Sequence, residues 1–417
     1  MPLRSFRSLF CLALLGSAGL QPASAAPDLA SLFAQAWQRQ PEAQAAALRH
    51  QAAQAERASA DSWSPEPAAL SLEGKTDRWQ RNDGSRELSL GVSLPLWLPG
   101  ERSRKAALGD AEVDAASERL RATQWNLAAS VRQAWWDGQR ARSALALAQD
   151  NLVSARQLAA DVQRRFDAGD MARSELLQAQ AALAQAEAVE AQAQGGCRAA
   201  AATLAQWSGA VLLPCAGDAV ADEALGAEPA LATDGVLPLA DAHPLLADAQ
   251  AQASVAQRSA ELLAVQRRAN PTLNLATTRD RGAADERYQR SVTIGITVPL
   301  GAGVRAQARE SAALAQALEA QTRSSQERER LHAQAQAAQA RAAAAAVQRD
   351  ALARSAALAQ QSRTFVARAF ALGEADWPTR LRVEQEAQQA QRQAALARID
   401  AAAAQSDLRQ ALGLLPE

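Results

Sequence analysis

The sequence of 417 residues predicts a mainly α-helical protein made of two tandem copies of one unit, each combining a β-hairpin with a long α-helical hairpin. The two copies are recognised by a shared register. The motifs Leu94-Pro95-Leu96 and Val298-Pro299-Leu300 are 204 residues apart (299 − 95), and the turn glycines Gly169 and Gly373 have the same offset. Near the ends of the two halves, a leucine and a glycine repeat at this offset as well. Because several separate landmarks keep one register, the chain is interpreted as a tandem duplication.

Long proline-free stretches predict the helices. The segments 101–166 and 304–370 contain no proline and are rich in alanine and glutamine, so each is expected to form one helix about 100 Å long at ~1.5 Å per residue. Each should end at a glycine turn, where glycine supplies a left-handed cap. A return helix is then expected over 173–207 in the first copy and over 378–412 in the second. Each copy therefore contains a long antiparallel helical hairpin, spanning 101–207 and 304–412.

Heptad spacing predicts how these helices pack. Leucine and valine recur at coiled-coil positions of the first long helix, with alanine filling many gaps, which permits close helix approach. The second long helix keeps this frame but is interrupted by Arg328, Arg349 and Arg363. Its seam is therefore expected to be weaker and partly hydrated. The adjacent Trp135 and Trp136 are interpreted as packing residues.

Alternating segments predict the β-structure. Leu88, Leu90 and Val92 alternate with small polar residues, and the stretch from Val292 to Val298 repeats the pattern. Polar turns precede both runs, so hairpins are expected over 67–98 and 271–300, each apolar on one face. Aromatic residues lie near the strand ends, as in the girdles of membrane barrels: Trp79, Trp97 and Tyr288.

The ends and the junction complete the expected organisation. Residues 1–26 have the charged start, apolar middle and small-residue cleavage site of a secretory signal, and the apolar run is short for a membrane anchor. The first repeat is expected over 27–209, an irregular connector over 210–238 and the second repeat over 239–417. The mature chain keeps Cys197 and Cys215, which either form a disulfide across the junction or remain two free thiols.

Several function classes are not supported by the residues. A formal net charge of −1 without a Lys/Arg block does not favour nucleic acid. No nucleophile–base pair, phosphate loop or carboxylate pair indicates an enzyme, and no cofactor is expected. His50, His243 and His332 lie far apart without ligand spacing, so they do not predict a metal site.

The apolar faces of the hairpins must be shielded from water. For a secreted chain with such strands, the hydrocarbon of the outer membrane is the environment that would shield them. A sheet edge cannot remain open in lipid, so the strands must close into a barrel. Two hairpins supply four strands, fewer than the smallest such barrels contain. Oligomerisation is therefore expected to complete the barrel, with two chains giving eight strands or three giving twelve.

Together these motifs resemble the TolC-like outer-membrane efflux proteins, from the signal peptide to the C-terminus. The residues that carry the resemblance are the duplicated Val/Leu-Pro-Leu hairpin ends and the two glycine tips. The resemblance implies a homotrimer with a twelve-stranded barrel in outer-membrane lipid and a helical periplasmic tunnel, in a Gram-negative bacterium. It also implies passive efflux of metal cations or small toxic compounds, together with a periplasmic adaptor protein and an inner-membrane pump. The short chain and the lack of an acylation cysteine look most like the heavy-metal (CzcC-like) branch.

The resemblance also implies where partners and a gate lie. The expected adaptor-docking residues flank the two helical tips: Phe166, Gly169, Asp170, Arg173, Phe370, Gly373, Glu374 and Trp377. The candidate tunnel gate comprises Glu374, Asp376, Arg380 and Arg382. Arginines here occupy positions where relatives carry a ring of carboxylates, so an acidic gate is not implied.

Two other protein classes share some of these features. A periplasmic adaptor also has a signal and a long helical hairpin, but it would have one hairpin flanked by split β-domains. A soluble coiled-coil scaffold would leave the alternating strands unexplained. The repeat register of 204 residues favours the channel.

Overall fold

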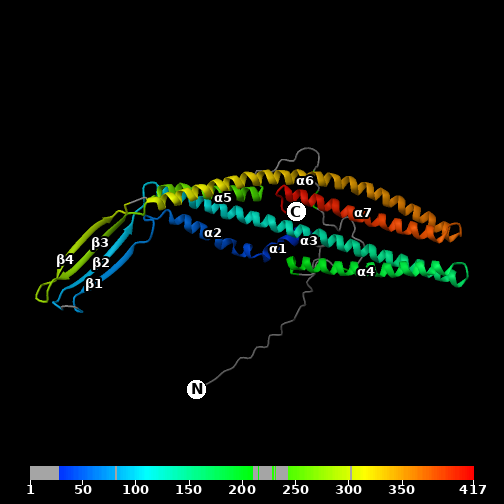
Figure 1. The fold of residues 1–417 in the computed structure, drawn as a ribbon, viewed down its shortest axis with the longest axis horizontal. Coiled ribbons are helices and arrows are strands. Elements are labelled where there is room, and N and C mark those ends of the chain that lie inside the picture. The colour runs from blue at the N-terminus through cyan, green and yellow to red at the C-terminus, as the bar shows by residue number, and fades with distance from the viewer. Residues whose placement is uncertain are drawn as a thin grey trace, which may run out of the picture.

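The structure is a computed structural model that describes residues 28–79, 82–209, 215, 228–229, 231, 243–300 and 303–417. The molecule is elongated, with a β-sheet at one end and two helical turns at the other (Figure 1). The expected signal peptide lies outside the described residues, and so does most of the expected connector.

Proline divides the first helical segment. Helix α1 spans Leu29–Arg39 and α2 spans Pro41–Ser59. Proline fits the first position of α2 because its missing N–H would have no partner inside the helix. Helix α5, Pro244–Val265, has the corresponding place in the second repeat, again beginning at a proline.

Two antiparallel helical hairpins form most of the length of the molecule (Figure 1). The first consists of α3, Glu101–Asp167, and α4, Arg173–Ser208. The second consists of α6, Gly303–Ala371, and α7, Trp377–Ala411. The limits of all four helices lie within one residue of those expected from the sequence.

The main core lies where α1 crosses the two hairpins. Val131 and Trp135 of α3 pack there with Leu32 of α1, Leu204 of α4 and Ile399 of α7. Trp135 and Trp136 are buried, which confirms their interpretation as packing residues. Helix α1 contacts α3 and α4 of the first hairpin, and the same cluster extends to α7 of the second, so the two repeats share one core at mid-length.

The two long helices differ in burial, as their seams predict. Helix α3 buries residues along most of its length, whereas α6 buries mainly alanines. Arg328 and Arg349 are exposed, in agreement with a partly hydrated seam. Arg363 is only partly exposed and forms an ion pair described below.

The two predicted hairpins join into one antiparallel sheet. Its strands are β1, Ala69–Thr76; β2, Arg86–Pro95; β3, Thr272–Arg281; and β4, Gln289–Thr297. Their order is β1-β2-β3-β4, so β2 of the first repeat pairs with β3 of the second. Strands β1 and β4 form the two edges of this sheet.

The register separates the side chains into two chemically different faces. Leu70, Val92, Leu275 and Ile294 lie opposite one another in a row across the four strands, and all four are exposed. The next row, on the other face, contains small residues: Ser71, Gly91, Ala276 and Thr293. In β2 and β3 the side chains of the apolar face are more exposed than the small and polar side chains of the opposite face. The sheet therefore curves around its polar face and exposes its apolar face.

None of the helices in the described ranges has an apolar stretch of the length needed to span a bilayer.

Candidate functional site

The candidate site lies at the end of the molecule opposite the sheet, where each helical hairpin turns. We call residues 166–173 the first tip and residues 370–377 the second tip. At the first tip Gly169 has φ of 85°, and the N–H of Asp170 donates to the carbonyl oxygen of Arg165 at 2.8 Å. At the second tip Gly373 has φ of 79° and closes the same turn. A Cβ added at either glycine would have no other atom within 4 Å, so space does not explain the glycines. The left-handed backbone conformation is therefore the reason that glycine is required at both positions.

The two return helices begin with different caps. Glu175 accepts a hydrogen bond from the N–H of Ala172 at 2.8 Å, before α4. At the second tip the carboxylate of Asp376 accepts from the N–H of Thr379 at 3.1 Å, and this hydrogen bonding lowers the pKa of Asp376. Asp376, a candidate gate residue, is therefore an exposed helix cap that stays ionised at neutral pH.

An apolar cluster holds the two tips together. Phe370 and Trp377 of the second tip pack with Val162 and Leu176 of the first hairpin, and the edge of Phe166 borders the cluster. The rings of Phe370 and Trp377 are 6.1 Å apart between centroids. Only 1% of the surface of Trp377 is exposed. The aromatic residues thus lie between the tips.

Polar contacts reinforce this cluster. The guanidinium of Arg165 lies 4.5 Å from the ring centroid of Phe370 and donates to its carbonyl oxygen at 3.4 Å. The indole N–H of Trp377 donates to the side-chain oxygen of Gln178 at 3.2 Å. A cation–π contact and two sets of hydrogen bonds therefore connect the first hairpin to the second tip.

The predicted docking residues divide into two groups. Gly169, Asp170, Arg173, Gly373 and Glu374 are exposed on the turns and are accessible to a partner. The three aromatic candidates are not: Phe370 and Trp377 are buried and Phe166 is half-buried. Their role in adaptor docking stays a prediction, and in this conformation they pack the tips against each other.

An ion-paired triad was not anticipated from the sequence. Glu384 on α7 is buried and accepts from Arg363 of α6 at 2.8 and 2.9 Å and from Arg380 at 3.2 Å. The spacing of Arg380 and Glu384 is a signal that could have found this pair, because residues four apart share a helix face. Arg363 could be placed only by tertiary structure. Arg380 is thus held by Glu384, while Arg382 and Glu374 remain exposed.

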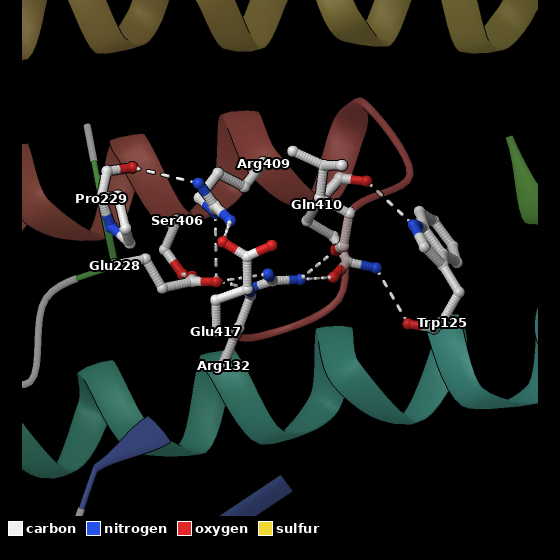
Figure 2. Close-up of polar contacts among 9 residues, drawn as sticks. Trp125, Arg132, Glu228, Pro229, Ser406, Arg409, Gln410 and Glu417 are labelled. Atoms are coloured by element: carbon white, nitrogen blue, oxygen red, sulfur yellow. Dashed lines mark hydrogen bonds and ion pairs between the residues drawn. The ribbon is translucent and has the colours of Figure 1, made fainter. Parts of the chain in front are cut away.

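A second buried polar cluster lies at mid-length, far from the tips (Figure 2). Glu228, in a described part of the connector, accepts from Nε and Nη2 of Arg132 on α3 at 2.9 and 2.6 Å. Arg409 of α7 lies 3.4 Å from the same carboxylate, and Ser406 also donates to it. The side chains of Arg132 and Glu228 are 1% and 0% exposed.

The same cluster includes the C-terminal segment. Arg409 donates to Glu417 at 2.7 Å, and Arg132 donates to the carbonyl oxygen of Leu414 at 3.1 Å. One buried carboxylate therefore brings together the connector, α3, α7 and the chain end (Figure 2). No sequence pattern indicated these pairs, since their members lie far apart in the chain.

Cysteine and histidine side chains are also placed by the structure. Cys197 and Cys215 form a disulfide, with Cα atoms 5.9 Å apart. His50 and His332 are exposed, whereas His243 is buried and caps α5 by accepting from the N–H of Leu245 at 3.3 Å. In the described ranges no three His, Cys, Asp or Glu residues are arranged to hold a metal ion.

Comparison with known proteins defines the class. Residues 32–210 match the model of the family described as outer membrane efflux protein. A search of curated protein sequences finds no match to this chain.

Solved structures of outer membrane channels are similar over nearly the whole chain. CusC, whose structures address transmembrane channel formation, has a TM-score of 0.76 at 18% identity, over 93% of this chain and 92% of CusC. VceC, an outer membrane protein of Vibrio cholerae, has a TM-score of 0.71 at 18% identity, over 93% of this chain and 97% of VceC. The open MtrE outer membrane channel of Neisseria gonorrhoeae has a TM-score of 0.71 at 17% identity, over 93% of this chain and 89% of MtrE. At these identities the likeness establishes the fold.

The fold is thus that of outer membrane channels. The family model covers the first repeat, and the second repeat has the same order of elements at the offset of 204 residues. The resemblance seen in the sequence is confirmed.

Proposed function

We propose that three copies of this chain close a twelve-stranded barrel, continue into a helical tunnel, and conduct substrates passively from the periplasm to the exterior. The observation that carries this proposal is the sheet, which has two edge strands, β1 and β4, and an exposed apolar face. An open edge is not stable in hydrocarbon, and four strands are too few to close a barrel. Neighbouring copies therefore supply the missing strands, and no chemical step is involved.

The charges of the polar sheet face support a cationic cargo. Glu73, Glu87 and Asp280 lie on this face, with Lys75 as its single strand cation. In the barrel the face lines the lumen, so each copy contributes three carboxylates and one ammonium. Rings of carboxylates favour cations in a pore. Metal cations fit this lumen, and positively charged small toxic compounds are the second cargo class that it suits.

The tips are proposed as the regulated end of the tunnel. A periplasmic adaptor engages the exposed turns and inserts helices beside them, and an inner-membrane pump supplies the energy. A groove of about 710 Å³ between the two hairpins, lined by α3, α4 and α7, supports this arrangement. Adaptor helices would compete with the Arg165–Phe370 and Trp377–Gln178 contacts and so open the tips.

The proposed gate chemistry follows from which candidates remain accessible. Glu374, Asp376 and Arg382 are exposed and can face the tunnel mouth, whereas Arg380 is engaged by Glu384. We propose that Arg380 acts in holding α6 and α7 together, and that the exposed residues contact the cargo.

The deciding experiment is fractionation of cells, detergent extraction and mass determination of the native particle. The proposal expects an outer-membrane particle of three chains. Reconstitution in planar bilayers under a salt gradient then tests the cargo charge, with a reversal potential that indicates cation preference. A soluble periplasmic monomer would overturn the channel and favour a scaffold or an adaptor.

A further inference from the structure

The apolar face of the sheet ends in a group of arginines. Along this face, rows made mainly of leucine, valine and isoleucine continue up to Leu72, Leu90, Thr277 and Val292, and Leu88 lies in the row beyond. The next row contains Arg279 and Arg290, which lie opposite each other, and the row after it contains Arg86 opposite Arg281. We call these four residues the arginine border. Successive rows are only about 6.6 Å apart, so the arginines directly follow the apolar surface.

The arginine border is asymmetric in the membrane. The strand ends that carry it lie away from the helices (Figure 1), and in the proposed channel the helices extend into the periplasm. The arginine border therefore lies on the external side. At the helix-proximal end of the sheet the strands finish with Ala69, Pro95, Thr272 and Thr297, none of which is charged, and the exposed Arg268 and Arg305 lie beyond the strands. General snorkelling of cations to water would not require this asymmetry.

The four guanidinium groups lack carboxylate partners among the described residues. None of them forms a salt bridge there, and the acidic residues of the same strands lie on the opposite face. Arg281 donates to the carbonyl oxygen of Gly84 at 3.1 Å. Four neighbouring cations that form no salt bridge among the described residues create a local positive potential on this face, which favours binding of a negatively charged group.

The ring of Tyr288 contacts two of these arginines. The guanidinium carbons of Arg279 and Arg281 lie 4.4 and 4.9 Å from the ring centroid of Tyr288. The two like charges are thus oriented by the same ring, with the donors of their guanidinium forks still available. This arrangement suits an anion that can accept several hydrogen bonds.

A hollow lies beside the arginine border. Its volume is about 440 Å³, and it is lined by Gly74, Lys75, Thr76, Arg86, Glu87, Leu88, Arg279 and Tyr288. Gly74 provides the space, because no other atom lies within 4 Å of an added Cβ. The hollow combines a hydroxyl, two guanidinium groups and an open backbone position, and Lys75 and Glu87, which alternate onto the other face of the sheet, also border it.

We propose that the arginine border binds the phosphate groups of the phosphorylated lipid that forms the outer leaflet of the outer membrane. Guanidinium groups pair with phosphate oxygens through two parallel N–H···O bonds, and the adjacent apolar rows receive the acyl chains. This inference rests on the proposed function, since the apolar face must meet lipid. The proposed function requires only that this surface contacts lipid in general. The inference adds that the surface binds one class of lipid, through its phosphate groups.

The test uses the purified full-length particle in detergent, titrated with bisphosphoryl lipid A and followed by native mass spectrometry. The main variant is Arg279→Gln/Arg290→Gln, and Arg279→Lys/Arg290→Lys keeps the charge but removes the forked geometry. The matched control is Arg268→Gln/Arg305→Gln, which removes two exposed arginines at the periplasmic end of the sheet. Monophosphoryl lipid A, phosphatidylglycerol and inorganic phosphate are the comparison ligands.

We expect bisphosphoryl lipid A to bind the glutamine variant about tenfold or more weakly, the lysine variant to be intermediate, and the control to bind like the wild type. Binding should also weaken with added salt. Equal lipid A affinity in the glutamine variant and the wild type would overturn the proposal, as would equal loss in the control. Equal affinity for phosphatidylglycerol would replace it with nonspecific anion binding, and tight binding of inorganic phosphate alone would exclude a lipid site. The trimer mass, read in the same spectra, tests the proposed function separately.

Discussion

The carboxylate of Glu228 accepts two hydrogen bonds, at 2.6 and 2.9 Å, from the guanidinium of Arg132, although the two residues belong to different segments and are 96 positions apart. Both side chains are fully enclosed, so this pair depends on mutual neutralisation. Its location at mid-length connects the junction between the repeats to the first long helix.

Glu228→Gln should destabilise the helical part strongly. The variant keeps the shape of the side chain but leaves the charges of Arg132 and Arg409 without their buried partner, at a cost of about 3–5 kcal/mol in the free energy of unfolding. Thermal unfolding followed by circular dichroism measures the effect. Glu386→Gln, at an exposed position of α7, is the matched control and should leave the transition unchanged. An unchanged transition in Glu228→Gln would show that the pair is not needed for stability.

Gly169→Val and Gly373→Val should impair export while the trimer still forms. Each substitution places a β-branched residue in a left-handed conformation, at a cost of about 1–2 kcal/mol at the tip. Tolerance of cells to metal salts, in a strain lacking its own copy, measures export. Asparagine at the same positions tolerates the conformation and should retain more export. Gly195→Ala, within α4 and in open space, is a control that should not impair it. Normal export in both valine variants would contradict the assigned role of the tips.

Trp377→Ala should loosen the contact between the tips and increase conductance. Removing this buried side chain costs about 3–5 kcal/mol of packing and breaks the hydrogen bond to Gln178. Single-channel recording in planar bilayers gives the open probability, which is expected to rise. Trp63→Ala removes an exposed tryptophan and should have no such effect on the channel. A variant that conducts like the wild type would mean that other contacts keep the tips closed.

His243 should make stability depend on pH. Burial is the main cause that lowers the pKa of His243 from 6.5. Because the folded-state pKa lies below the unfolded-state value, this contribution is complete above pH 6.5 and is lost as the pH falls through the lowered pKa. The melting temperature should therefore decrease between about pH 7 and about pH 5 by more in the wild type than in His243→Asn.

The histidine comparison needs two precautions. Burial raises the pKa of Asp407, which acts in the opposite direction, so the difference between the two proteins is the relevant quantity. His50→Asn, at an exposed site, should retain the wild-type profile. If His243→Asn has that profile too, the buried histidine is not the source of the pH dependence.

The disulfide between Cys197 and Cys215 should anchor the start of the connector. It closes a segment with a sequence separation of 18, and opening such a loop costs about 3 kcal/mol in the chain-entropy account. Non-reduced peptide mapping of the exported protein detects the bond directly, and Cys215→Ser should lower the melting temperature. Detection of two free thiols in the native protein would establish the alternative left open by the sequence.

Local and periodic features of the fold could be predicted from the sequence. The absence of proline and the glycine turns at Gly169 and Gly373 set the helix limits, because these residue types act on the backbone of their own segment. The alternation of Leu88, Leu90 and Val92 was sufficient to indicate a two-faced strand. The repeat of 204 residues then implied that every element occurs twice.

Contacts between distant segments were decided only by tertiary structure. The sequence predicted two separate hairpins, and the pairing of β2 with β3 became evident from the fold because it joins different repeats. Phe370 and Trp377 were predicted from the sequence as docking residues of the tip, and only the approach of the two hairpins shows that they are buried between them. Arg363 interrupts a heptad pattern in the sequence, yet it neutralises Glu384 in space. The periodicity of the sequence determines on which face of a helix or strand a residue lies. Tertiary packing determines which other segments contact that face.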